Sequence, residues 1–140
     1  MKRIALPLLL VLAFIAIAVI GTKSNHPTEA RAIVCADPVK GCAFSHRGLP
    51  ATLRFSRQPM PLQTFRLDVL APGAQRASVE LQMVGMGMGF NHYDLHAAAP
   101  GMVGADITLS MCVSGRRDWK LFLDIDGQRY VLAFSSAPHA

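Results

Sequence analysis

The chain has 140 residues and carries 14 lysines and arginines against 9 aspartates and glutamates, a formal net charge of +5. Lys2 and Arg3 supply two of these positive charges, and the remaining surplus is spread along the chain without a basic run, which argues against nucleic-acid binding. The length suits one domain with a modest core and excludes a large enzyme with a cleft between two domains.

The amino terminus begins with the basic residues Lys2 and Arg3 and continues with an apolar segment, residues 4–20. This segment is intermediate in length between the core of a signal peptide and a full membrane span. No small-residue cleavage site follows closely, so we expect residues 1–22 to be an uncleaved transmembrane helix, with a cleaved signal peptide as the alternative. The basic start predicts a single pass through the inner membrane with the rest of the chain in the periplasm.

A polar, proline-containing segment, residues 23–50, follows and is interpreted as a linker that carries a cysteine loop. Cys35 and Cys42 are separated by six residues that include Pro38 and Gly41, so the chain can turn and bring the two thiols together. In an oxidising compartment we expect a disulfide that staples the loop. A redox-active or metal-binding pair is the alternative, although the spacing differs from that of thioredoxin-type motifs.

From residue 51 onward, apolar and polar residues alternate with a period of two, which predicts strands and not helices. Seven strands are expected, around residues 53–55, 65–69, 79–83, 93–96, 105–111, 119–125 and 129–134. The sequence Asp126-Gly127 between the last two predicts a type I′ hairpin turn. Short strands and frequent turns favour an all-β domain, an antiparallel immunoglobulin-like sandwich over residues 51–135 with a tail at residues 136–140.

A glycine-rich stretch near the middle of the chain carries three methionines and a histidine within ten residues, 83–92. Thioether sulfur is a soft ligand that suits cuprous copper, and the glycines let the backbone approach a bound ion closely. The candidate copper ligands are Met86, Met88, His92 and Cys112, with Met83 and Met111 as further candidates. If the pleat continues past Met83, the residues Met86, Met88 and His92 lie on the opposite face of the sheet. If Gly85 and Gly87 break the pleat, this stretch is a loop at the edge of the sandwich, and in either case the three side chains can converge.

Two of these candidates have structural interpretations as well. Met83 occupies the alternation expected of a core residue, and methionine fills irregular interiors well. Cys112 is unpaired if Cys35 bonds to Cys42, and it is then a buried small residue or a thiolate ligand beside Met111. Otherwise Cys112 is itself the partner of Cys35 or Cys42.

The remaining polar residues give little support to catalysis. No carboxylate pair in a shared pocket, no Ser-His-Asp signature and no phosphate-binding loop can be recognised, so we do not expect an enzyme. His46, His96 and His139 have no partner at a recognisable spacing. The cluster 116–118, Arg-Arg-Asp, reads as a polar turn between strands or as a docking edge for an acidic partner.

Five features of the chain can be considered together: the expected amino-terminal anchor, the Cys-x6-Cys loop, the Gly-Met-Gly-Met-Gly stretch at 85–89, the Leu-Ser-Met-Cys sequence at 109–112 and the hairpin of Trp119. In these features the chain resembles a family of small membrane-anchored periplasmic proteins of proteobacteria. The resemblance covers residues 33–134. More distantly, the layout is similar to FixH-like and YtkA-like domains, which are immunoglobulin-like sandwiches. The family has proline where Ser110 stands and methionine where Arg117 stands, and the second difference removes one sulfur ligand.

The resemblance implies a role in copper supply or in the assembly of cytochrome oxidase, with a copper-handling or oxidase-assembly protein as partner. A first hypothesis is therefore a periplasmic domain that binds or passes cuprous copper. A second is a metal-free interaction module of an inner-membrane complex, with an adaptable apolar Met-Gly edge. A third hypothesis, ranked below these, is a thiol-disulfide partner that uses the three cysteines.

Overall fold

The computed structural model describes residues 29–85, 91–111 and 115–138, and in these ranges the chain is all-β without a helix. The expectation of an all-β domain is therefore confirmed. The nine strands are β1 (Arg31–Ala32), β2 (Cys42–His46), β3 (Leu49–Phe55), β4 (Thr64–Leu70), β5 (Ala77–Met83), β6 (His92–Ala99), β7 (Met102–Thr108), β8 (Asp118–Ile125) and β9 (Gln128–Ser135).

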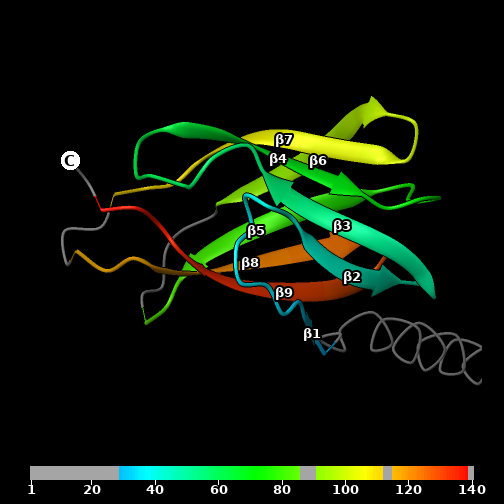
Figure 1. Ribbon diagram of the computed structural model, residues 1–140, viewed down its shortest axis with the longest axis horizontal. Helices are drawn as coiled ribbons and strands as arrows, with labels where there is room; N and C mark the ends of the chain where they lie inside the picture. The colour runs from blue at the N-terminus through cyan, green and yellow to red at the C-terminus, as the bar shows by residue number, and fades with distance from the viewer. Residues whose placement is uncertain (1–28, 86–90, 112–114, 139–140) are drawn as a thin grey trace, which may run out of the picture.

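The strands form one curled sheet in the order β1-β9-β8-β5-β6-β7-β4-β3-β2. Strand β6 joins its two halves, because the first part of β6 pairs with β5 while its last part pairs with β7. The register of β6 against β7 shifts between Ala97 and Ala99, and such irregularities let a strand bend. As a result β4 and β7 lie above β5, β8 and β9 in Figure 1, and the core lies between the two halves.

The expectation of about seven antiparallel strands needs correction, since the sheet has nine strands and is mixed. The seven predicted strands correspond to β3 through β9. The two additional strands, β1 and β2, lie in the segment that we interpreted as a linker with a cysteine loop. Strand β1 runs parallel to β9, with Arg31 beside Tyr130, and it is this pair that makes the sheet mixed.

The core is built from the inward positions of both halves. In β5 and β8 every second residue is buried, as the alternation predicted, and Leu81, Leu121 and Leu123 are at most 1% exposed. Phe55 of β3 packs against Phe134 of β9, with ring centroids 5.3 Å apart, and so joins the two halves of the sheet. Burial of each such side chain contributes about 1.5–3 kcal/mol to folding.

The turn between β8 and β9 has the predicted form. Ile125 pairs with Gln128, so the loop has two residues, Asp126 and Gly127. Both have positive φ, 48° and 82°, as a type I′ turn requires. The carboxylate of Asp126 is consequently held at the end of the sheet, where it meets the chain before β5.

The predicted disulfide between Cys35 and Cys42 is present, with a Cα–Cα distance of 5.2 Å. The bond links the two ends of the segment 35–42, in which the chain crosses from β1, beside β9, to β2 at the other edge of the sheet (Figure 1). Cys42 is 1% exposed and belongs to the core. A thiolate at this position would be buried among apolar side chains, which makes it a poor leaving group for thiol-disulfide exchange. The environment thus suits a structural staple.

Several sequence-based expectations fall outside the described residues. They are the transmembrane helix at residues 1–22 and the candidate ligands Met86, Met88 and Cys112. Among the residues that the structure does describe, no helix is long and apolar enough to cross a membrane.

Candidate functional site

The topology brings the two connections that hold most of the candidate sulfur ligands to one end of the fold. Strands β5 and β7 run in the same direction, because each is antiparallel to β6, and β8 runs opposite to β5. The connection after β5, which contains Met86 and Met88, therefore begins at the end where the β7–β8 connection, which contains Met111 and Cys112, also begins. We call this the Met-Gly end and define it by the described residues 83–85, 109–111 and 115–118.

Backbone and side-chain hydrogen bonds join the two connections directly. The N–H of Val84 donates to the carbonyl of Asp118 at 3.0 Å. The guanidinium of Arg116 donates to the carbonyl of Val84 at 2.8 Å. Gly85 has a φ of +80°, which glycine adopts without strain. The bond between Arg116 and Val84 thus holds the start of the Met-Gly stretch against the start of β8.

The described ligand candidates occupy different environments. Met83 is 3% exposed and lies in the core opposite Trp119. The side chain of His92 is 43% exposed, and its Nε2 lies 3.4 Å from Oδ1 of Asp94. His92 pairs with Glu80, one of the outward residues of β5, so Met83 and His92 lie on opposite faces of the sheet. This placement of Met83 on the inward face and His92 on the outward face agrees with the alternation of apolar and polar residues in the sequence. The structure does not bring these two candidate ligands together.

Met111, by contrast, is 51% exposed at the Met-Gly end. A second exposed apolar side chain of this end is Val84, at 38%, and Leu62, at 59%, lies on its border. The N–H of Leu62 donates to the carbonyl of Leu109 at 2.9 Å, which fixes Leu62 beside the end of β7. The sequence analysis missed Leu62 and Val84. The two prolines around Met60, at 59 and 61, were the signal that an apolar segment leaves the sheet there.

Two buried polar groups lie beneath the Met-Gly end. Nε1 of Trp119 and Oγ of Ser136 have no hydrogen-bond partner among the described residues. Trp119 and Ser136 are 1% and 2% exposed. Trp119 is the only tryptophan of the chain, and its position opposite Met83 makes its fluorescence a local probe of this end.

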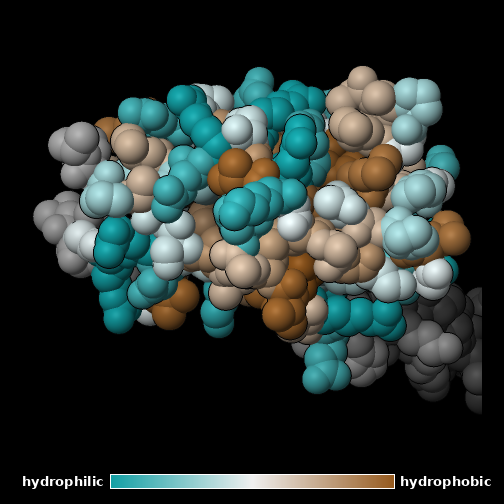
Figure 2. Space-filling model, viewed as in Figure 1, coloured by the Kyte–Doolittle hydropathy of each residue, from teal (hydrophilic) through white to brown (hydrophobic). Residues whose placement is uncertain are grey.

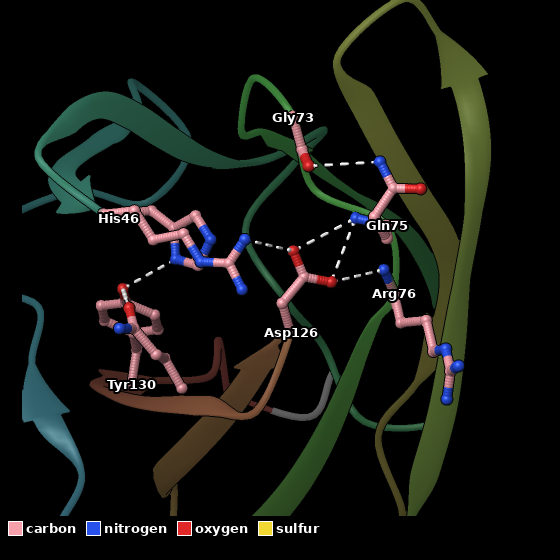
Figure 3. Close-up of polar contacts among 8 residues, drawn as sticks. His46, Gly73, Gln75, Arg76, Asp126 and Tyr130 are labelled. Carbon is pink, nitrogen blue, oxygen red and sulfur yellow. Dashed lines mark hydrogen bonds and ion pairs between the residues drawn. The ribbon is translucent and has the colours of Figure 1, made fainter.

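A second polar cluster lies at the opposite end of the fold, around the β8–β9 turn (Figure 3). The carboxylate of Asp126 accepts hydrogen bonds from the backbone N–H groups of Gln75 and Arg76, at 3.1 and 2.9 Å, and lies 3.5 Å from Nη1 of Arg47. The backbone N–H of Arg76, followed by that of Gln75 and the charge of Arg47, holds the pKa of Asp126 below its ordinary value. The carboxylate thereby fastens the hairpin to the chain that precedes β5.

His46 is the buried partner of this cluster. It is 3% exposed, and its Nδ1 lies 2.9 Å from the hydroxyl of Tyr130, which donates to Oε1 of Gln128 at 2.9 Å. Because that hydroxyl proton points to Gln128, the oxygen of Tyr130 accepts from Nδ1 of His46. Burial, together with the positive charge of Arg47, lowers the pKa of His46. The neutral imidazole leaves Nε2 unprotonated and without a partner among the described residues.

In the described ranges no group of three histidine, cysteine, aspartate or glutamate side chains is arranged to hold a metal ion. The groove beside Asp126, about 550 Å³ in volume, has Arg47, Arg76, Asp94 and Asp124 among its lining residues, so both signs of charge are mixed there. The thioether ligands predicted from the sequence, Met86 and Met88, lie outside the described residues.

No protein-family model, curated protein or solved structure matched this chain.

Proposed function

We propose that the chain is a non-enzymatic periplasmic domain, anchored in the inner membrane by residues 1–22, that binds or passes cuprous copper at its Met-Gly end. Met86 and Met88 would supply thioether ligands, and His92 or Cys112 would complete the site. One observation carries the proposal: β5 and β8 are neighbours, so the connection with Met86 and Met88 begins beside the point where the connection with Cys112 ends. The bond between Arg116 and Val84 keeps the two connections together.

The fold also suits such a role. We infer an immunoglobulin-like arrangement, because β4 pairs with β7, β5 pairs with β8, and β6 passes from one half of the sheet to the other. In this arrangement a rigid sheet presents connections at its ends, and binding residues commonly lie on such connections. The disulfide between Cys35 and Cys42 would be stable in an oxidising compartment.

The test is a titration of the full chain with cuprous ion in a buffer that contains a thiol-free reductant, followed by the fluorescence of Trp119. We expect saturable quenching with one copper per chain, since Trp119 lies directly beneath the Met-Gly end. Replacement of Met86 and Met88 by leucine should abolish the quenching and leave the fold intact. Met102→Leu is the matched control, because Met102 begins β7 at the opposite end. Quenching that survives in the double variant would refute the copper proposal.

The exposed apolar side chains favour a second candidate, a metal-free interaction module. Leu62, Val84 and Met111 form part of the Met-Gly end and its border, and exposed apolar groups of this kind commonly mark contact surfaces. A photo-crosslinking residue at position 62 of the full chain in its native membrane should then yield one discrete adduct. Position 70 is the control, since Leu70 is 42% exposed and pairs with Met102 at the opposite end. Equal adducts at both positions would argue against a specific surface.

A further inference from the structure

A groove of about 880 Å³ runs along the free side of β9, away from the strand's contacts with β8. One wall is the chain at 35–39, next to the disulfide, and the other is the chain at 56–59. Residues 133–135 of β9 also line it. We call it the β9 groove.

The backbone of β9 has an open hydrogen-bonding register in this groove. The pairing of Ile125 with Gln128 in the hairpin turn means that even-numbered residues of β9 direct their N–H and C=O groups to β8, whereas odd-numbered residues direct theirs to the other side. Two hydrogen bonds are made by the outward groups of odd-numbered residues. The N–H of Ile33 donates to the carbonyl of Val131 at 2.8 Å, and the N–H of Ala137 donates to the carbonyl of Pro59 at 2.7 Å.

Between these two bonds lie Ala133 and Ser135. Their N–H and C=O groups have no backbone partner among the described residues, and both side chains are exposed and small. Strand β1 ends at Ala32, and among the described residues no other strand pairs with β9 on this side. The two bonded positions, Val131 and Ala137, lie about 20 Å apart at the rise of an extended strand, so the open positions between them can pair with a few residues of an extended peptide.

Edges of this kind are normally blocked, by lysine, proline or a covering segment, because they pair readily with other strands. Here the exposed side chains at 133 and 135 are alanine and serine, and neither blocks the approach. The groove has no net charge, since its two charged side chains, Asp37 and Arg57, are of opposite sign. Asp37 lies 3.7 Å from Lys40, and the guanidinium of Arg57 donates to the carbonyl of Thr64. Figure 2 shows apolar and polar side chains intermixed on this face of the molecule.

From the open register and the absence of net charge on the walls we infer that the β9 groove is a docking site for an extended, uncharged segment of a partner protein, which adds as a strand beside Ala133 and Ser135. The backbone of β9 would provide the hydrogen bonds, and the walls formed by Val39 and Pro59 would accept small apolar side chains. This inference is independent of copper, because none of the groove residues is a proposed ligand.

The test is an amide-shift titration of the isotope-labelled full chain with a capped heptapeptide of alternating valine and threonine. We expect saturable shifts of the Ala133 and Ser135 amides together with those of the groove walls. In the Ala133→Pro variant, which removes an outward N–H and leaves the ladder with β8 intact, binding should weaken at least about fivefold. Ala133→Val keeps the N–H and should bind like the parent. Ser135→Pro replaces the first variant if that one does not fold.

Four outcomes would overturn the inference. The first is the absence of saturable shifts at about 1 mM peptide, a concentration that detects even weak docking. The second is equal binding by the parent and the proline variant. The third is equal binding of the same peptide with every backbone nitrogen methylated, which would mean that only side chains are recognised. The fourth is concentration-dependent shifts of Ala133 and Ser135 without peptide, which would identify a second copy of the chain as the occupant.

Discussion

Met83 should behave as a core residue whose replacement changes stability and not copper affinity. Its side chain is 3% exposed and lies opposite Trp119 between the two halves of the sheet. Truncation of such a methionine to alanine removes its transfer free energy and leaves a cavity, at a cost of about 2–5 kcal/mol. Since domains of this size are stable by only about 5–15 kcal/mol, Met83→Ala should lower the melting temperature by about 10–20 °C.

The assay is urea unfolding of the full chain followed by the fluorescence of Trp119, with cuprous titration of the same samples. Met83→Leu keeps the volume and should cost less than about 1.5 kcal/mol, with the copper affinity of the parent. Met111→Ala is the exposed control and should lie within about 0.5 kcal/mol of the parent. The reasoning fails if Met83→Ala costs less than about 1 kcal/mol. It also fails if Met83→Leu loses copper at unchanged stability, since Met83 would then be a ligand.

Three further predictions concern the disulfide and the polar cluster around the β8–β9 turn. Replacement of Cys35 and Cys42 by serine should lower the free energy of unfolding by about 2 kcal/mol, from the chain entropy of a loop with a sequence separation of 7; an unchanged urea midpoint would contradict this. Because the folded pKa of His46 is lowered, the unfolded chain binds that proton more tightly, so stability should fall as the pH drops below about 6.5. His46→Gln should flatten this dependence in urea melts between about pH 7.5 and 5.5, and an equal slope in the variant would assign it to other groups. Asp126→Ala should lower the free energy of unfolding by about 1–2 kcal/mol, because the hydrogen bonds from two backbone N–H groups to the carboxylate are lost. Asp126→Asn should cost less, since asparagine tolerates positive φ. Thermal melts that rank the two variants in the reverse order would refute that account.

Much of the fold could be predicted from local pattern. The alternation of apolar residues identified β3 through β9, and it placed Met83 correctly on the inward face. The Asp126-Gly127 turn was equally accessible, because two-residue type I′ turns depend on residues that accept positive φ. The disulfide followed from the short Cys35–Cys42 spacing and a loop that can turn.

Strands β1 and β2 could not be predicted in this way. Strand β1 has only two residues and exists because Arg31 and Ala32 pair with β9, about 100 residues later in the chain. Strand β2 lies in a proline-containing segment, and its Phe44 packs on the ring of Tyr130 at 5.0 Å. Propensity within a short window has no information about such distant partners.

The sequence by itself determined the all-β class, the strand faces and the residue types from which a thioether copper site can be built, because each depends on neighbours along the chain. Only the tertiary structure decided that the connections after β5 and β7 begin at one end of the fold. It also decided that His46 meets Tyr130, 84 residues away, and that Ala133 and Ser135 present an open edge. These features depend on strand order, which is fixed by the burial of side chains far apart in sequence and not by any local preference.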